Sequence, residues 1–348
     1  MKKATDIKSL LRQNIKAMQS YAFARAEFSG NAKVFLDANE NPFESKYNRY
    51  PDPWHQELKE KLAAYKNIAS EYIFLGNGSD EAIDLLIRAF CNPGLDKIVL
   101  CTPTYGMYKV TAALNDIEVQ NIPLLENFQP DTEIIQKIKD ASCKLLFLCS
   151  PNNPSGNCLS TESIGEIIDS FPGIVVLDEA YIDFADQKSF INRLDKCQNL
   201  VVLQTLSKAW GMAGIRIGMA FANPQIIAVL NKIKAPYNIS TPNMEAALNV
   251  LANTQPMKKQ ISKIVEQRNH LSAILQGFNE VEKVYPSDAN FLLVKFKDAK
   301  YVFQTLCERG IVLRDRSKQV NCEHCLRITI GTPKENKILV NTLNEFLK

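Results

Sequence analysis

The sequence contains no long hydrophobic run. Its longest apolar stretches, such as KLLFLC (144–149) and GIVVL (173–177), have the length of buried strands and are too short to cross a bilayer. It also has no large excess of one charge, because 41 basic and 38 acidic residues leave a net charge of +3. That balance argues against nucleic acid as a partner.

The N-terminal segment MKKATDIKSLLRQNIK begins with two lysines but lacks the apolar core of a signal peptide. Charged residues recur every few positions, so the segment predicts an ordinary amphipathic helix. We therefore expect a cytoplasmic protein without a membrane partner.

Residues that commonly bind metals are few or scattered. The three histidines, His55, His270 and His324, form no ligand cluster, and the nine cysteines are an odd number without a disulfide framework. Cys322 and Cys325, in CEHC, resemble half of a zinc site, but a structural zinc site needs a second pair at matching spacing and the sequence has none. We expect reduced thiols and no metal.

The middle of the chain alternates short apolar runs with segments of helical period. In DEAIDLLIRAF, for example, the apolar positions 82, 85, 86, 89 and 90 follow the spacing of one helix face. Continuous apolar runs are typical of parallel strands that are buried on both sides. The sequence therefore predicts an α/β fold, a mostly parallel sheet with helices on both faces, with strands at 97–101, 145–149, 174–178, 200–204 and 217–221.

From about residue 240 the pattern changes to a long helical stretch followed by NFLLVKF, a helix, GIVLRD and LRITIG. This mixture predicts a smaller α+β domain, and 348 residues leave room for about two domains. We expect an N-terminal arm at 1–30, a large domain at 31–238 and a small domain at 239–348.

Polar residues follow the predicted strands, where parallel sheets bind their ligands. Asp178 ends a buried strand, and a carboxylate there is costly unless it is paired or serves as a cap. Lys208, in TLSKAWG, tends to lose its charge if buried and then becomes a nucleophile. LGNGSDEAI lacks the third glycine of a dinucleotide fingerprint, which disfavours a nicotinamide dehydrogenase. It reads better as a helix start whose amides, near Ser79 and Asp80, bind phosphate.

Taken together, these loops offer one set of groups. Ser79, Ser207 and Arg216 suit a phosphate, Tyr105 provides an aromatic ring, and Asp178 and Lys208 provide a carboxylate and an amine. Pyridoxal phosphate needs all of these, because its phosphate, ring, ring nitrogen and aldehyde each require a partner.

At this point a family resemblance emerges. Lys208 in SKAWGMAGIRIG, Asp178 in DEAY and Asn153 in SPNNPSG resemble the fold-type I aminotransferases that use pyridoxal phosphate. LDANENPF (36–43), RYPDP (49–53), APYNISTP (235–242), GIVLRD and CLRITIGT are similar to the histidinol-phosphate aminotransferase family, and the similarity covers nearly the whole chain. Trp210 and the Asn77-Gly78-Ser79 run depart from the family's usual residues.

The resemblance implies a role for each cofactor residue. Lys208 would take the cofactor's aldehyde and later move a proton, while Asp178 would face the ring nitrogen. Tyr181 and Asn153 would donate to the ring oxygen, and Tyr105 would stack on the ring. The phosphate would be held by the backbone amides of Ser79 and Asp80, by Ser207 and Arg216, and more weakly by Thr205.

The resemblance also implies substrates and a partner. The reaction would interconvert L-histidinol phosphate and 2-oxoglutarate with imidazole acetol phosphate and L-glutamate, in histidine biosynthesis. Arg327 would bind the carboxylate of glutamate, and Arg314 the phosphate of histidinol phosphate, with Tyr21 and Asn39 as further substrate-binding residues. Tyr50, in RYPDP, would reach the cofactor of a neighbouring subunit and so implies a homodimer with shared active sites; by itself it would be a surface loop aromatic.

Two other functions remain open. A threonine-phosphate decarboxylase of the same fold also binds a phosphorylated amine precursor, but it is a lyase that needs no amino acceptor. A cofactor-binding regulator without turnover is the other alternative, although such regulators usually carry an added DNA-binding domain, for which we find no residues.

Overall fold

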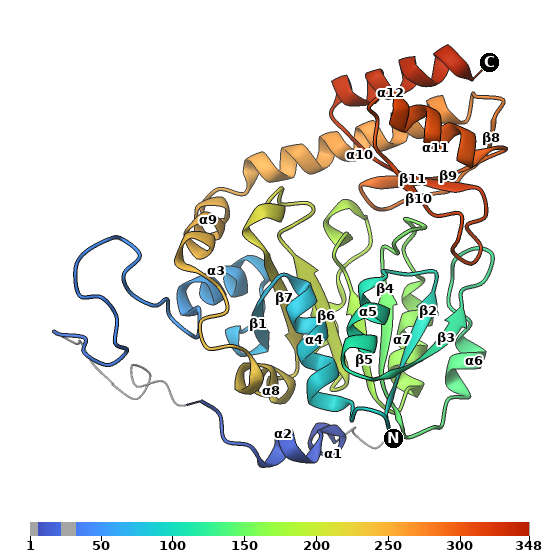
Figure 1. Ribbon diagram of the computed structural model, residues 1–348. Coiled ribbons are helices and arrows are strands. Elements are labelled where there is room, and N and C mark those ends of the chain that lie inside the picture. Colours follow the sequence, from blue (N-terminus) through green and yellow to red (C-terminus); the bar gives the residue numbers. More distant parts are fainter. Residues whose placement is uncertain (1–5, 22–32, 348) are drawn as a thin grey trace.

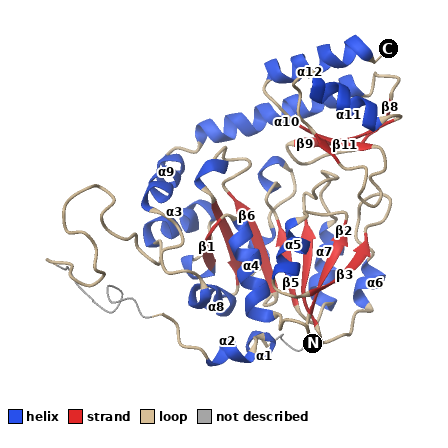
Figure 2. Ribbon diagram, in the orientation of Figure 1, coloured by secondary structure: helices blue, strands red, loops and turns tan. Residues whose placement is uncertain are grey.

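The computed structural model describes residues 6–21 and 33–347 (Figure 1). Two sheets organise the chain, one of seven strands in the order β1-β7-β6-β5-β4-β2-β3 and one of four strands in the order β10-β11-β9-β8 (Figure 2). The large sheet consists of β1 (Ile73–Asn77), β2 (Lys97–Thr102), β3 (Glu118–Pro123), β4 (Cys143–Cys149), β5 (Ile174–Asp178), β6 (Leu200–Thr205) and β7 (Ile217–Ala222). The predicted α/β class is confirmed.

All five predicted strands are present, and β2 to β6 run parallel. The strand predicted at 217–221 differs in direction, because β7 runs antiparallel to β6, and β1 runs antiparallel to β7. The connection from β6 to β7 contains no crossover helix that could bring the chain back to the other edge, so an antiparallel return results. The start of β7 therefore lies at the same edge as the carboxyl ends of β2 to β6.

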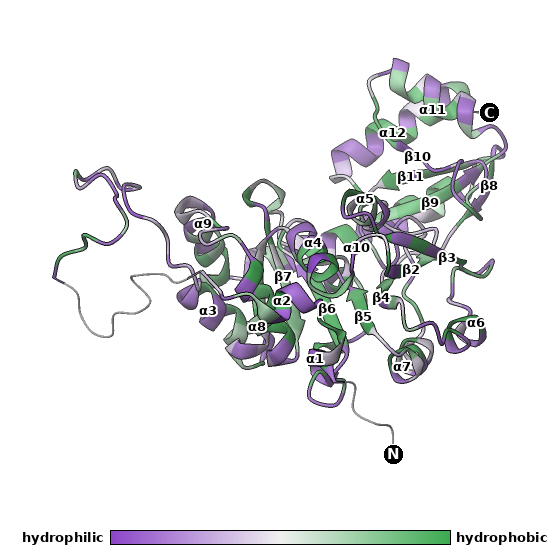
Figure 3. Cartoon of the chain, turned by 60° about the horizontal axis from the view of Figure 1, so that its bottom comes forward, coloured by the Kyte–Doolittle hydropathy of each residue, from purple (hydrophilic) through white to green (hydrophobic). Residues whose placement is uncertain are grey.

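Helices cover both faces of this sheet, and residues alternate between the two sides. Val176 packs with the helices of one face, while its neighbours Val175 and Leu177 pack with those of the other. In Figure 3 the central strands are coloured as hydrophobic, whereas the helices show hydrophilic outer sides. One face is covered by α4 (Ser79–Phe90), α5 (Met107–Leu114) and α8 (Pro224–Ile233), and the other by α3 (Gln56–Lys66), α6 (Thr132–Gln136) and α7 (Thr161–Ser170).

The small sheet forms the predicted α+β unit. Its apolar face packs against long helices in a core of its own, which includes Leu271, Val294 and Leu343. Of GIVLRD, only the last two residues form a strand. The unit contains β8 (Val281–Val284), β9 (Phe291–Phe296), β10 (Arg314–Asp315), β11 (Cys325–Thr329), α10 (Gln255–Leu275), α11 (Ala299–Glu308) and α12 (Pro333–Phe346), and α9 (Thr241–Ala252) precedes it.

The N-terminal segment forms two short helices, α1 (Ile7–Leu10) and α2 (Gln13–Ala17). We had expected a single helix. The helix breaks between them because the backbone amide of Arg12 donates to the carbonyl of Ala89, at the end of α4, at 3.1 Å. Residues 1–5 and 22–30 of the expected arm lie outside the described residues. None of the helices in the described ranges combines the length and the apolar character that crossing a membrane requires.

Gly218 brings the start of α4 against β7. A Cβ atom at this position would lie 2.0 Å from the backbone nitrogen of Ser79 and 2.3 Å from the carbonyl carbon of Gly78. Both neighbours are backbone atoms, so a larger residue must push the helix start away from the sheet. The absence of a side chain at Gly218 thus fixes where the first amides of α4 point.

We expect Gly218→Ala to destabilise the protein by at least about 1–3 kcal/mol, the usual cost of overpacking. Urea unfolding measures this difference. Gly214→Ala is the matched control, because no atom lies within 4 Å of a Cβ atom there. Equal stability of both variants would contradict the close approach at Gly218.

Candidate active site

The amino end of α4 provides unpaired backbone donors. The helix begins at Ser79, and its N-cap is Gly78, which has no side chain to accept from the first amides. Ser79 and Asp80 both line a pocket at the carboxyl edge of the large sheet. Free amides and the positive end of the helix dipole together favour an anion at this point.

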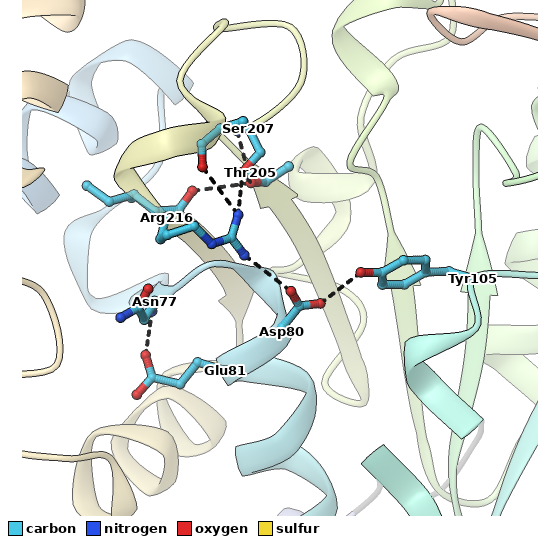
Figure 4. Close-up of polar contacts among 9 residues, drawn as sticks. Asn77, Asp80, Glu81, Tyr105, Thr205, Ser207 and Arg216 are labelled. Atoms are coloured by element: carbon cyan, nitrogen blue, oxygen red, sulfur yellow. Dashed lines mark hydrogen bonds and ion pairs between the residues drawn. The ribbon is translucent and has the colours of Figure 1, made fainter. Parts of the chain in front are cut away.

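Side chains from three segments complete this end of the pocket (Figure 4). Thr205 Oγ1 donates to Ser207 Oγ at 3.0 Å, and Arg216 Nη1 donates to the same oxygen at 3.3 Å. Arg216 Nη2 lies 3.3 Å from Asp80 Oδ2, and the Tyr105 hydroxyl donates to Asp80 Oδ1 at 3.2 Å. The carboxylate of Asp80 is thus engaged by Arg216 and Tyr105, which leaves its backbone amide as the group that an anion would meet.

Lys208 follows β6, and its side chain lines the pocket. Its Nζ lies 5.7 Å from the centre of the Tyr181 ring. The side chain is accessible through the hollow, but the surrounding protein displaces bulk water, and this desolvation, followed by the charge of Arg327, lowers the pKa of Lys208. The side-chain amine of Lys208 is therefore easier to deprotonate than the amine of a surface lysine.

Asp178 lies at the floor of the pocket and is 3% exposed. Its Oδ2 accepts from the Tyr108 hydroxyl at 2.6 Å, and its Oδ1 accepts from the backbone amide of Ala180 at 3.0 Å. Burial raises the pKa of Asp178, while these two hydrogen bonds act in the opposite direction. Each oxygen keeps a second lone pair, so the carboxylate can still face a positively charged group in the pocket.

Asn153 and Arg327 connect the two sheets. Arg327 Nη1, from β11, donates to Asn153 Oδ1 at 2.6 Å, and the guanidinium lies 5.3 Å from the centre of the Phe291 ring. Because the side-chain oxygen of Asn153 is taken, its amide nitrogen is the donor that remains for the pocket. Burial lowers the pKa of Arg327.

The structure brings ten of the predicted cofactor residues to one pocket. They are Ser79, Asp80, Tyr105, Asn153, Asp178, Tyr181, Thr205, Ser207, Lys208 and Arg216, and Cys149 and Ala180 line the pocket with them. Hydroxyls, bare amides and a guanidinium at one end, aromatic rings at the sides, and a carboxylate and an amine suit the phosphate, ring, ring nitrogen and aldehyde of pyridoxal phosphate. The donor set therefore fits that cofactor.

Five predicted residues do not line this pocket in the single chain, and one of them, Arg327, reaches it only through its bond to Asn153. Tyr21 is 68% exposed, and Asn39 is exposed on the segment after it. Tyr50 stacks on Tyr237 with ring centres 4.3 Å apart. Arg314 is exposed on β10, directly opposite Arg327 in the small sheet.

Comparison with known proteins decides the family. The model of the aminotransferase class I and II family matches residues 30–343. A histidinol-phosphate aminotransferase of Parabacteroides distasonis is 54% identical over 97% of this chain and 98% of that relative. This chain belongs to the histidinol-phosphate aminotransferase family. The corresponding protein of Cytophaga hutchinsonii is 49% identical over 99% of this chain and the whole of that relative.

Solved structures of the family have the same fold. The histidinol-phosphate aminotransferase from Clostridium acetobutylicum superposes with a TM-score of 0.78 at 26% identity, over 85% of this chain and 90% of that one. The enzyme from Sinorhizobium meliloti, solved in complex with pyridoxal-5'-phosphate, gives the same TM-score and identity over 85% of this chain and 82% of its own. The predicted fold-type I architecture is therefore confirmed.

Tyr108 is a site residue that the sequence did not single out. It is fully buried in α5, stacks on Phe147 with ring centres 4.8 Å apart, and holds Asp178 through its hydroxyl. The sequence signal was faint, namely a tyrosine one helical turn after Tyr105 in PTYGMY. Its partner Asp178 is 70 residues away in sequence, so the contact could not be read from local spacing.

We expect Tyr108→Phe to destabilise the cofactor-free protein by about 1.5–3 kcal/mol at neutral pH, the usual range for a hydrogen bond to a charged group. The hydroxyl lowers the pKa of Asp178, so its loss raises that pKa further above the unfolded value. When folding raises the pKa of a carboxyl group, the folded protein loses stability as pH rises through that folded-state pKa. The gap to wild type should therefore widen as pH rises above about 4, the usual pKa of an aspartate.

Urea unfolding across this pH range measures the effect. Tyr72→Phe, at a half-buried tyrosine packed against the core under the other sheet face, is the control and should show no such pH dependence. A gap that is the same at every pH would mean that Tyr108 only fills space.

Metal ligands do not gather anywhere in residues 6–21 and 33–347 as a group of three or more histidine, cysteine, aspartate or glutamate side chains. Cys322 and Cys325 are free and buried. Burial raises the pKa of Cys322 to about 12 and that of Cys325 to about 11, so neither thiol is a ready thiolate ligand.

Proposed function

We propose that the protein is a pyridoxal-phosphate-dependent aminotransferase that interconverts L-histidinol phosphate and 2-oxoglutarate with imidazole acetol phosphate and L-glutamate. The observation that carries the proposal is a lysine of lowered pKa in the same pocket as a buried aspartate and a phosphate cradle. The family membership supports it. Pyridoxal phosphate, when bound, supplies an aldehyde that links to amines and a ring that accepts electrons from the substrate's Cα.

Lys208 serves as the attachment point and the proton carrier. With the cofactor bound, the Nζ of Lys208 would hold its aldehyde end and, tethered beside the substrate, would accept the proton from Cα. The lowered pKa favours this step, because only the neutral amine can accept a proton. Ser207, Arg216 and the first amides of α4 hold the phosphate end, so that Lys208 always meets the same atoms.

Asp178 holds a proton at the ring nitrogen. Its carboxylate is fixed from behind by Tyr108 and by the amide of Ala180, so it cannot turn away from the pocket. Asn153 and Tyr181 would donate to the ring oxygen, and Tyr105 would cover the ring face. We assign Arg327 to the carboxylate of glutamate. The substrate phosphate is assigned to Arg314 together with Tyr21, and Asn39 is a further substrate-binding residue.

We propose a cytoplasmic homodimer whose subunits share their active sites. The segment at 33–54 projects from the body of the chain (Figure 1) and carries large apolar side chains in solvent, among them Leu36 at 89% and Phe43 at 80% exposure. A second copy of the chain would cover them and bring Tyr50 to the neighbouring cofactor. Mixing inactive Lys208→Ala and Tyr50→Phe subunits should restore activity in hybrid dimers. Full activity in a monomer, as sized by light scattering, would contradict the shared site.

The absorbance spectrum of the purified holoenzyme tests the function. Glutamate alone should convert the bound cofactor from its aldehyde to its amine form, and so should histidinol phosphate alone, in a single turnover. Release of carbon dioxide from threonine phosphate without any amino acceptor would instead indicate the decarboxylase. That alternative is not favoured, because the L-threonine-O-3-phosphate decarboxylase of Porphyromonas gingivalis is only 24% identical and shares the fold alone.

A further inference from the structure

Three arginines lie together on one side of the small sheet. Arg314 is directly opposite Arg327 in the antiparallel register of β10 and β11, and Arg316 continues this ladder by donating its backbone amide to the carbonyl of Cys325 at 2.9 Å. Directly opposite residues and residues two apart share a face, so the three side chains point the same way. We call Arg314, Arg316 and Arg327 the arginine trio. Asp315 points to the other face and accepts from the amide of Ser317.

The trio lacks a carboxylate partner among the described residues. Among the described residues, no carboxylate lies within ion-pair distance of any of the three guanidinium groups. The polar contact of Arg327 is with the neutral side chain of Asn153. The Nε of Arg316 is buried and has no hydrogen-bond partner. A buried donor without a partner costs free energy, so this nitrogen can still bind an acceptor beyond the described residues.

Arg316 lies next to the cofactor pocket, because Arg327, on the same face of the small sheet, donates to Asn153, which lines that pocket. Burial, followed by the charges of Arg327 and Arg314, lowers its pKa to about 10, and Tyr181, which lines the pocket, acts in the opposite direction. Arg316 remains fully charged at neutral pH. Its side chain shares a sheet face with Arg314 and Arg327, so the three guanidinium groups can share one anion.

A phosphate monoester is the anion that suits this arrangement. It carries a charge of about −1.5 to −2 at neutral pH and three strong acceptor oxygens, whereas a carboxylate carries one charge and two oxygens. One guanidinium can donate two parallel hydrogen bonds to a carboxylate and neutralise its charge, but it cannot neutralise the larger charge of a phosphate. Two arginines on one strand edge, Arg314 and Arg316, match the larger charge.

We propose that Arg316 binds substrate, and that Arg314 and Arg316 together hold the phosphate of the amino donor while Arg327 serves both donor and acceptor. This inference rests on the proposed function. The family resemblance implied no role for Arg316. Under this proposal, Arg316 helps the site to distinguish a phosphorylated amino alcohol from a dicarboxylic acid.

The test uses holoenzyme carrying Arg316→Gln, which keeps most of the side-chain length but removes the charge. Single-turnover kinetics compare histidinol phosphate, unphosphorylated histidinol and glutamate. We expect the variant to lose at least about tenfold in kcat/KM with histidinol phosphate, the order for one lost charged contact, and less than about threefold with the other two. Lys318→Gln removes an exposed positive charge from the same turn and should change none of the three.

A binding measurement provides a readout without turnover. Calorimetry should show that Arg316→Gln weakens the binding of 3-(imidazol-4-yl)propyl phosphate, which lacks the reacting amine. The binding of the corresponding alcohol should be unchanged. Arg316→Lys should retain an intermediate affinity, and it replaces the glutamine variant if that variant does not fold. Equal losses with all three substrates, or an equal loss in Lys318→Gln, would overturn the inference. The proposed function would fail separately, if wild-type holoenzyme did not accept the amino group of histidinol phosphate at all.

Discussion

Lys208→Ala is expected to reduce kcat by about 10⁴-fold or more, the upper end of the range for losing a positioned acid–base group. The variant loses both the attachment point for the cofactor and the proton carrier beside Cα. No other lysine lines the pocket, so the neighbouring side chains offer no replacement within the described residues. Steady-state turnover with glutamate and imidazole acetol phosphate measures the loss.

Borohydride reduction of the wild-type holoenzyme, followed by peptide mapping, locates the attached cofactor independently of activity. Lys234 is a demanding control, because desolvation lowers its pKa to about 8 although it lies outside the pocket. A merely reactive lysine would be labelled there as well. Label on Lys234 or on any other lysine, with Lys208 free, would falsify the assignment.

Asp178→Asn is expected to have the second-largest effect. Asparagine preserves the shape, and its oxygen can accept from the Ala180 amide while its nitrogen donates to the Tyr108 hydroxyl, but it cannot hold a proton at the ring nitrogen by charge. Losing a buried charged contact costs about 2–5 kcal/mol, so kcat should fall by roughly 30-fold to several thousand-fold. Single-turnover rates with each amino donor measure this loss.

The stability of the Asp178→Asn variant should move in the other direction. Burial raises the pKa of Asp178 in the folded protein, which means that the ionised carboxylate costs stability once pH exceeds the folded pKa. Removing the charge should therefore leave the cofactor-free variant at least as stable as wild type at neutral pH in urea unfolding. A variant that loses stability and activity together would show that Asp178 mainly supports the fold.

The sequence predicted those parts of the fold that are buried on both sides. The strands β2 and β4 to β7 leave continuous apolar runs, because helices cover both of their faces. It missed β3, an edge strand whose residues EVQNIP are largely solvent-accessible, and β1, which ends in the polar turn before α4. The reversed direction of β7 could not be predicted from its composition, since an apolar run reads the same either way.

For the candidate site, the decisive inference was topological. Asp178, Asn153 and Lys208 are far apart in sequence, but each lies at or just after the carboxyl end of a parallel strand, so all of them reach one edge of the sheet. Contacts that depend on side-chain direction were not accessible. The bond from Tyr108 to Asp178 links a helix interior to a strand end, and Arg316 joins its two neighbours only through the register of β10 and β11.

The two halves of the site differ in their long-range electric field. In the cofactor pocket, the basic residues Lys208 and Arg216 lie together with the acidic residues Asp80 and Asp178, which offset their charge. The arginine trio has no such match among the described residues and projects a positive field into solvent. Such fields speed the diffusional capture of anions and fade as salt shortens the screening length, which is about 10 Å at 0.1 M. Anionic substrates, which exchange at every turnover, are therefore steered toward the site by this field. The cofactor stays bound and is captured by short-range contacts. Rising salt should therefore slow substrate association and hardly affect cofactor binding.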